Sequence, residues 1–220
     1  MSTATLIIGE SGTGKTASLR NFDPARTLLI QAIRKPLSFK KPGWGLVSSA
    51  NPSGNIIVSD DSETVIHAMR KTRRKIIVLD DFQYVMANEF MRRSQETGFQ
   101  KFSDIGRHAW DLFNAAAGLP DDVRVYIMSH SQSDDFGKTK CKTLGKLLDD
   151  KITVEGMFTI VLKTVVQGGE YSFATRNNGQ DTTKTPIGLF DDDHIENDLA
   201  MVDAKICDYY DLTNRHAEAA

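Results

Sequence analysis

The sequence predicts an α/β protein with a mostly parallel β-sheet, helices on both faces and a C-terminal β-hairpin extension. Short β-rich segments alternate with helical ones over the first 130 residues, the order that produces parallel strands covered by helices. A glycine-rich motif joins the first predicted strand to the first predicted helix, as phosphate-binding strand–loop–helix units do. Two glycines at 168–169 separate the last two β-rich runs, which indicates a hairpin.

The elements follow in order along the chain. Asp60, Asp61 and Ser62 each offer an N-cap oxygen to the helix that follows, on which Val65 and Met69 lie one turn apart. The β-branched run before Asp80 is typical of a central strand buried on both faces. The expected strands are 5–8, 27–31, 56–58, 75–79, 123–129, 157–166 and 171–175. The expected helices are 15–21, one after Ser62, 83–93, 103–117 and about 194–212, with Ile195, Leu199, Val202, Ile206 and Tyr209 on one face.

Two long segments lack clear periodicity. Residues 35–55 hold three prolines and three glycines around Trp44, so we expect irregular structure. Residues 131–151 are polar, and we expect a mobile loop with a short helix near 144–148.

Length and composition indicate one globular domain over residues 1–220. At roughly 100–200 residues per domain, 220 residues leave little room for a second. Charged residues at 25% and hydrophobic residues at 40% are typical of soluble proteins, which argues against a disordered or fibrous chain. Cys141 and Cys207 lack the spacing of a zinc site or disulfide scaffold, so we expect a reducing compartment.

Charge and hydropathy exclude two further classes. The formal net charge of −2 gives no global attraction to DNA or to a membrane. No apolar run approaches the roughly 20 residues that cross a bilayer, and the N-terminus lacks a secretory signal pattern. We therefore expect a cytoplasmic protein without a membrane partner.

Residues 9–16 match the phosphate-binding motif G-x-x-x-x-G-K-[ST] in full. Glycines without Cβ atoms let several backbone N–H groups converge on a polyphosphate. Lys15 then reaches the β- and γ-phosphates, and the Thr16 hydroxyl can ligate a bridging Mg²⁺. The sequence therefore predicts a site for ATP and Mg²⁺, with cofactor-binding residues Gly9, Glu10, Ser11, Gly12, Thr13, Gly14, Lys15 and Thr16.

A second acidic site follows the strand 75–79. Asp80 is the candidate metal ligand together with Thr16, on a strand that we expect to lie beside the first one. Asp81 is the candidate catalytic carboxylate that polarises the attacking water, with Lys15 as the other catalytic residue. The simpler alternative is an acidic turn that caps the helix after it.

Polar residues after the strand 123–129 lie where ligands of open α/β sheets bind. Ser129, His130 and Gln132 are candidate sensors of the γ-phosphate. For His130, a hydrogen-bonded residue at a strand end is an equally good interpretation.

These passages resemble P-loop ATPases with a RecA-like core, and among them the short phage-encoded ATPases related to single-strand annealing recombinases. The resemblance is carried by GESGTGKT, IIVLDDF, YIMSHSQ and the hairpin from TIVLKTVVQGGEY to TPIGLF, and covers about residues 3–190. It implies ATP hydrolysis, assembly into homo-oligomeric rings or filaments, and action on single-stranded DNA in phage recombination or replication, in the cytoplasm of a bacterial host.

The resemblance also implies basic residues that act across a subunit interface. Arg176 and Lys184, near the end of the hairpin, are the candidates for reaching the γ-phosphate of a neighbouring subunit; a solvated surface charge is the alternative for each. The chain departs from RecA-like proteins after the strand 27–31, where Ala32, Ile33 and Arg34 stand in place of a catalytic Glu. Hydrolysis must then use Asp81 or be slow.

Candidate DNA contacts lie in the polar loop after the sensor strand. Lys138, Lys140, Lys142 and Lys146 are spaced to follow a phosphate backbone, although acidic residues flank them and Phe136 is the only aromatic residue of the loop. A second basic cluster at 70–75 ends a helix, where the helix dipole explains it more simply.

Two other functions remain open from the sequence. A nucleotide-dependent interaction module would bind ATP with little hydrolysis, which the missing Glu favours. A small-molecule phosphotransferase would need an arginine-rich lid, and residues 131–151 contain no arginine.

Overall fold

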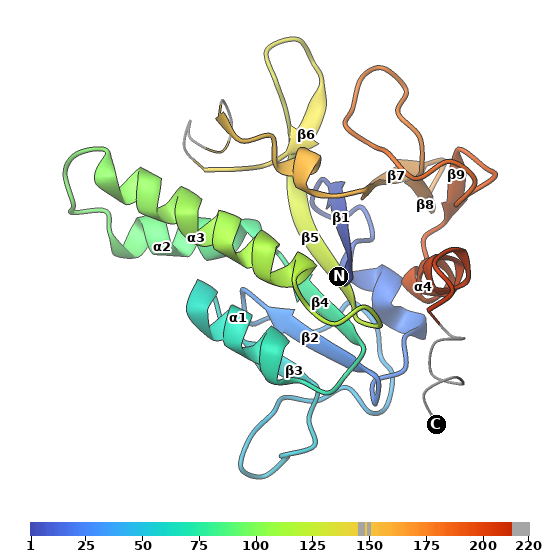
Figure 1. Ribbon diagram of the computed structural model, residues 1–220, viewed down its shortest axis with the longest axis horizontal. Coiled ribbons are helices and arrows are strands. Elements are labelled where there is room, and N and C mark those ends of the chain that lie inside the picture. The colour runs from blue at the N-terminus through green and yellow to red at the C-terminus, as the bar shows by residue number, and fades with distance from the viewer. Residues whose placement is uncertain (145–147, 149–150, 213–220) are drawn as a thin grey trace.

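The computed structural model describes the chain except for residues 145–147, 149–150 and 213–220. Its centre is a nine-stranded, mostly parallel β-sheet, which confirms the predicted α/β class (Figure 1). The order across the sheet is β3-β2-β4-β5-β1-β7-β8-β9, with β6 paired to β5 alone. The strands are β1 (Thr3–Gly9), β2 (Thr27–Gln31), β3 (Ile56–Val58), β4 (Ile76–Asp80), β5 (Arg124–Ser133), β6 (Thr139–Cys141), β7 (Ile160–Gln167), β8 (Glu170–Ala174) and β9 (His194–Glu196).

Hydrophobic side chains alternate between the two faces of the sheet because successive residues of a strand point to opposite sides. On β1, Leu6 and Ile8 belong to one buried cluster and Ile7 to the other. On β4, Leu79 faces the first cluster and Val78 the second. The sheet therefore separates two cores, as expected of strands that are buried on both faces.

Helices cover both faces. On one face lie α1 (Ser62–Lys71), α2 (Gln83–Arg92) and α3 (Gln100–Ala117). On the other lie the short 3-10 helix η1 (Thr16–Asn21) and the C-terminal helix α4 (Leu199–Tyr209), which contact each other. A further 3-10 turn, η3 (Val154–Met157), precedes β7. Of the three candidate caps of α1, Asp61 is the one that acts: its carboxylate accepts a hydrogen bond from Thr64 N at 2.8 Å.

The predicted hairpin is also confirmed. β7 runs parallel to β1, and β8 turns back antiparallel to β7 after Gly168 and Gly169. β9 then pairs antiparallel with β8 at the end of the sheet. The C-terminal part of the chain is thus added beside β1. This strand leads into residues 9–16, the predicted phosphate-binding loop, which we call the phosphate loop.

The structure corrects four expectations about local structure. The helix expected at 15–21 is 3-10, because Phe22 N already bonds to Leu19 O and ends it. β5 does not stop at Ser129 but continues to Ser133, where it forms an antiparallel ribbon with β6 in the expected loop. Ile195 lies on β9, since the Asp198 side chain caps α4 and starts that helix at Leu199. The helix expected near 144–148 lies mostly outside the described residues.

The fourth correction concerns strand order. The strand that ends in Asp80 does not lie beside the first strand, because β5 lies between β4 and β1 and pairs with both. Cys141 and Cys207 are both buried, and no disulfide joins them. Within the described residues, each helix is too short or too polar to span a bilayer.

Candidate functional site

The phosphate loop runs from Gly9, the last residue of β1, to Thr16, the first residue of η1. Two positions of the loop require glycine. A Cβ atom at Gly9 would lie 1.7 Å from the Thr164 hydroxyl oxygen on β7. Gly14 has a φ of +92°, and a Cβ there would lie 2.9 Å from the Tyr171 ring on β8. The loop therefore packs closely against the β7–β8 hairpin at both of its ends.

Lys15 is buried within this loop, with 6% of its surface exposed. Its Nζ donates hydrogen bonds to the carbonyl oxygens of Gly9 at 2.8 Å and Glu10 at 2.7 Å. The ammonium group is thus folded back onto the loop and compensated by backbone dipoles. A phosphate oxygen can replace these carbonyl oxygens as the acceptor of the hydrogen bonds from the ammonium group.

Asp80 meets Thr16 at the carboxyl edge of the sheet. The Thr16 hydroxyl donates a 2.9 Å hydrogen bond to Asp80 Oδ2, across 64 residues of sequence. Asp80 is 1% exposed, and its Oδ1 has no hydrogen-bond partner among the described residues. A buried carboxylate oxygen without a donor is costly, so this atom is available to a ligand.

Asp81 follows in a strained turn. Its φ of +61° places a non-glycine residue in the left-handed region, a conformation that aspartate tolerates better than most residues and that recurs at functional sites. Asp81 Oδ1 lies 3.4 Å from His130 Nε2, and Asp81 Oδ2 forms an ion pair with Lys35. Lys35 Nζ is also 3.8 Å from Asp80 Oδ2.

Except for the buried Asp80, these groups line one cavity of about 310 Å³. Lys15 and Thr16 come from the phosphate loop, Asp81 and His130 from the ends of β4 and β5, and Tyr171 from β8. Lys35 and Ser38 complete the lining from the segment after β2. The sheet therefore brings the predicted lysine, the catalytic carboxylate candidate and one sensor candidate to a single site.

Burial and charge shift the pKa values of four groups in the site. Burial lowers the pKa of Lys15 to about 8, although Asp81 and Asp80 oppose it. Burial, and then the charge of Asp81, raises the pKa of Asp80. Burial would lower the pKa of Lys35, but Asp80 and Asp81 outweigh it and raise this pKa. Burial and the nearby Lys15 lower the pKa of His130, so its imidazole is neutral at pH 7.

The residues present fit a magnesium–triphosphate group. Mg²⁺ in nucleotide sites takes one or two protein oxygens and completes its shell with water and phosphate oxygens. Thr16 and Asp80, with its free Oδ1, supply such oxygens. In the described part of the chain no three His, Cys, Asp or Glu residues cluster to hold a metal unaided. A cation here would therefore depend on ligand phosphates.

The other sensor candidates lie on β5. Ser129 is fully buried, and its hydroxyl oxygen lacks a hydrogen-bond partner in the parts of the chain that are described. Gln132 belongs to the ribbon, opposite Lys140 of β6. Of the three candidates, His130 alone is among the residues that line the cavity with Lys15.

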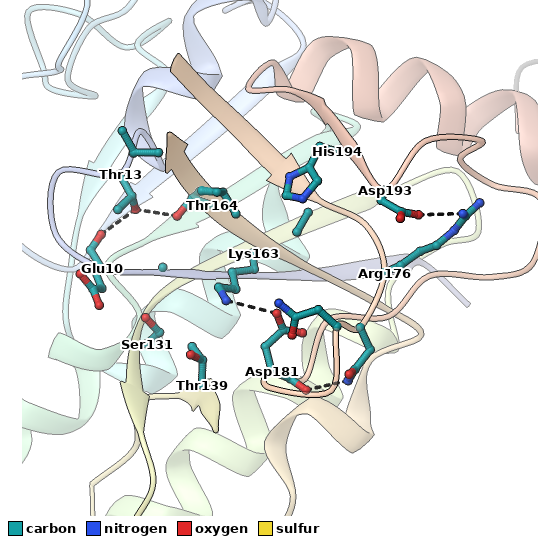
Figure 2. A pocket seen from close by; sticks show the side chains of 16 residues that line it. Glu10, Thr13, Ser131, Thr139, Lys163, Thr164, Arg176, Asp181, Asp193 and His194 are labelled. Carbon is teal, nitrogen blue, oxygen red and sulfur yellow. Dashed lines mark hydrogen bonds and ion pairs between the residues drawn. The ribbon is translucent and has the colours of Figure 1, made fainter. Parts of the chain in front are cut away.

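Arg176 and Lys184 lie away from that cavity. Figure 2 shows Arg176 directed at Asp193 and Lys163 directed at Asp181. These residues line a separate cavity of about 510 Å³ together with Glu10 and Thr13. Arg176 Nη1 lies 2.7 Å from Asp193 Oδ1. Lys184 is exposed and pairs through its backbone with Val161. Within one chain neither residue approaches Lys15, and a role across a subunit interface stays a prediction.

The lysines proposed to contact DNA lie on the β5–β6 ribbon. Lys138 and Lys142 are exposed and Lys140 is partly buried, while Lys146 lies outside the described residues. Phe136 at the ribbon tip is 97% exposed. The ribbon projects from the carboxyl edge of the sheet (Figure 1).

Sequence reasoning missed Lys35, Ser38 and Tyr171, which line the cavity, and Asn197 beside it. Lys35 lies four residues beyond β2, and its signal was a cation at the same sheet edge as Asp80. Tyr171 lies on β8 with its ring beside Gly14 of the phosphate loop, and no motif around position 171 indicates this contact. Asn197 is buried, its Oδ1 would lie 3.1 Å from a Cβ at Gly14, and its Nδ2 has no partner among the residues described.

Comparison of the chain with models of known protein families finds no match, and comparison with curated proteins finds none either.

Proposed function

We propose that this chain is a P-loop protein with a RecA-like core that binds ATP with Mg²⁺ and hydrolyses it. The observation that carries the proposal is the hydrogen bond from Thr16 to the buried Asp80, beside the buried Lys15. It joins the two sequence signals of a magnesium–triphosphate site, although they lie 64 residues apart. The mostly parallel sheet with the loop at its carboxyl edge supports the same proposal.

Each residue has a distinct role. The loop amides and Lys15 bind the phosphates, and Lys15 exchanges its bonds to the Gly9 and Glu10 carbonyls for phosphate oxygens. Thr16 and Asp80 hold the cation. Bound Mg²⁺ supplies charge neutralisation on the phosphates. Tyr171, half exposed beside Gly14, lies where its ring can contact the base.

Asp81 orients and deprotonates the attacking water. It lines the cavity, and neutral His130 adjoins one of its oxygens. The ion pair with Lys35 occupies the other oxygen, so a competent base requires this pair to loosen. If Thr16 and Asp80 held a cation, Lys35 would have less negative charge to neutralise and would be held less tightly by Asp81.

The same ion pair favours a second candidate function. If Lys35 stays on Asp81, the chain binds ATP and hydrolyses little, as a nucleotide-dependent interaction module. For the ATPase, we propose an oligomer, a ring or a filament, that acts on single-stranded DNA in phage recombination or replication. These partners rest on the resemblance described above.

The test is calorimetric titration of the protein with ATP in the presence of Mg²⁺, followed by a phosphate-release assay. Lys15→Ala removes charge-assisted hydrogen bonds worth about 1.5–3 kcal/mol, so binding should weaken roughly 10- to 150-fold. Lys205→Ala, an exposed lysine of α4 with no assigned role, is the matched control and should bind like the original chain. Absence of binding heat at any accessible concentration contradicts the proposal; binding without turnover favours the interaction module.

A further inference from the structure

A second cavity of about 690 Å³ lies against the β2–β3 edge of the sheet. Its lining comes almost entirely from the segment between these strands. Four cations and an aromatic pair characterise it: Arg34, Lys35, Lys40, Lys41, Phe39 and Trp44. We refer to it as the basic–aromatic groove.

Apart from Lys35, which pairs with Asp80 and Asp81, the cations of the groove have no acidic partner among the described residues. Residues 24–59 contain five Lys or Arg residues and no Asp or Glu, in a chain of net charge −2. No acidic side chain is among the described residues that line the groove. Arg34 and Lys40 are exposed, and neither makes an ion pair with any residue in the described part of the chain. The groove therefore presents a local positive field that the net charge conceals.

The aromatic side chains are fixed in place. Phe39 and Trp44 pack edge to face with ring centroids 5.6 Å apart, and both rest on the second core. Trp44 Nε1 is buried and finds no hydrogen-bond acceptor among the described residues. Lys41 Nζ donates to Phe22 O at 2.9 Å, which anchors the segment to the chain after η1. A fixed ring pair with an unused N–H donor suits a flat ligand that carries acceptors.

We propose that the basic–aromatic groove binds a single strand of nucleic acid. Arg34 and Lys40 contact its phosphates, and a base packs against Phe39 and Trp44. Cations that track a backbone, combined with aromatic rings for the bases, are the recurring composition of single-strand sites. A duplex keeps its bases stacked away from such rings. An acidic peptide would match the positive charge of the groove, but it lacks the regularly spaced flat bases that would pack against the two rings.

The groove suits this role better than the β5–β6 ribbon. On the ribbon, the Asp134 carboxylate accepts hydrogen bonds from the backbone N–H groups of Phe136 and Lys138, so negative charge lies at its tip. Asp135 lies next to it. Within the part of the chain that is described, the groove combines four cations and two rings with no acid.

Lys35 connects the groove to the candidate ATP site. It lines both cavities, and it bridges to Asp81 and Asp80. A nucleic acid phosphate that attracts Lys35 weakens its hold on Asp81, the proposed base. Occupation of the groove should therefore stimulate hydrolysis. This coupling rests on the proposed function, whereas strand binding by the groove does not.

The experiment measures binding of labelled oligo(dT) of about 30 nucleotides, longer than typical single-strand sites, by fluorescence anisotropy. The double variant Arg34→Ala/Lys40→Ala should bind roughly tenfold or more weakly, and its salt slope should be smaller by about 0.7 for each phosphate that it no longer neutralises. Arg70→Ala/Lys71→Ala on α1 removes the same charge elsewhere and should bind like the original chain. The variant Lys138→Ala/Lys142→Ala tests the ribbon. MgATP affinity is measured for every variant.

A second readout locates the strand at the rings. Trp44 and Trp110 are the only tryptophans, so Trp110→Phe leaves Trp44 as the single reporter. Oligo(dT) should quench its fluorescence, and a duplex should not. Three results would overturn strand binding by the groove. They are unchanged oligo(dT) affinity in Arg34→Ala/Lys40→Ala, no quenching of Trp44 fluorescence, and a loss of oligo(dT) affinity confined to the ribbon variant.

The outcomes separate the two proposals. A protein that binds MgATP but no oligo(dT) overturns the groove and leaves the ATP site standing. One that binds oligo(dT) through Arg34 and Lys40 but no MgATP supports the groove and overturns the proposed ATPase. Equal binding of oligo(dT) and duplex would overturn the single-strand assignment.

Discussion

The Thr16 hydroxyl donates a hydrogen bond to Asp80 Oδ2 even though β5 separates the strand that leads to Thr16 from the strand that ends in Asp80. The two residues meet because parallel strands end at the same edge, so a loop at that edge can span a neighbour. The contact fixes the separation between the phosphate loop and the carboxylate before any ligand binds. Such preorganisation lowers the cost of assembling a cation site.

Asp80→Asn should therefore uncouple ATP binding from Mg²⁺. The amide keeps an acceptor for Thr16 but loses the charge that a hard cation requires. Affinity for ATP with Mg²⁺ should fall at least roughly tenfold, corresponding to about 1.4 kcal/mol, while affinity without Mg²⁺ should be unchanged or higher. Calorimetry with and without the metal tests this. Equal Mg²⁺ dependence in both proteins would exclude Asp80 as a ligand.

The lowered pKa of Lys15 predicts how ATP binding depends on pH. Burial puts this pKa at about 8 rather than the ordinary 10.5, and a triphosphate favours the protonated form. Affinity should be constant below pH 8 and decline above it, by about tenfold per unit once Lys15 is neutral. Titrations from pH 7 to about 9.5 measure the decline. A flat profile would show that Lys15 stays charged throughout.

Asp81→Asn should separate catalysis from binding. If Asp81 deprotonates water, kcat should fall by roughly 10²–10⁴, with MgATP affinity within a few-fold of the original value. Asp135→Asn, an exposed carboxylate of the ribbon, is the control. Steady-state phosphate release and binding are measured on the same preparations. Unaltered turnover would assign the base elsewhere.

Tyr171→Ala should reveal the contribution of the base. Aromatic stacking is worth about 1–3 kcal/mol per base, so ATP should bind roughly 5- to 150-fold more weakly, while inorganic tripolyphosphate should bind unchanged. Tyr209→Ala on α4 is a matched control, with 42% of its surface exposed against 48% for Tyr171. Parallel weakening for both ligands would mean that Tyr171 supports the loop rather than the nucleoside.

Gly9→Ala should destabilise the fold, because the added methyl collides with the Thr164 hydroxyl. Overpacking of this kind costs about 1–3 kcal/mol. Thr164→Ala removes the colliding oxygen, so the double variant should lose less stability than the sum of the two single ones. Gly156→Ala, whose nearest neighbour would be 3.7 Å away, is the control. Denaturant unfolding measures all four, and strict additivity would contradict the proposed collision.

The parts of the fold that could be predicted have strong local signals. β2 and β3 have the bounds predicted from their apolar runs, and the Gly168–Gly169 turn fixes the hairpin. The β5–β6 ribbon was missed because its polar side chains show no buried face. Strand order was missed because alternation in sequence does not reveal which parallel strands are neighbours.

The candidate site divides in the same way. The phosphate loop, Asp80 and Asp81 could be predicted because each belongs to a short contiguous motif, and the structure places them together. Lys35 and Tyr171 reach the cavity from an irregular segment and from an added antiparallel strand. Their positions follow from tertiary packing, which no spacing rule encodes. The basic–aromatic groove likewise depends on how residues 34–46 fold back on the core.

The 3-10 helix η1, which follows the phosphate loop, is hydrogen-bonded to the segment that leads into the C-terminal helix α4. Arg20 donates a hydrogen bond to the Asn197 carbonyl, and Asn21 Nδ2 donates to Asp198 Oδ2 at 2.6 Å, just where α4 begins. A fragment that stops before this point would retain every motif residue yet lack the brace that holds them, so shortened versions of the protein should forfeit triphosphate affinity before they forfeit their sheet.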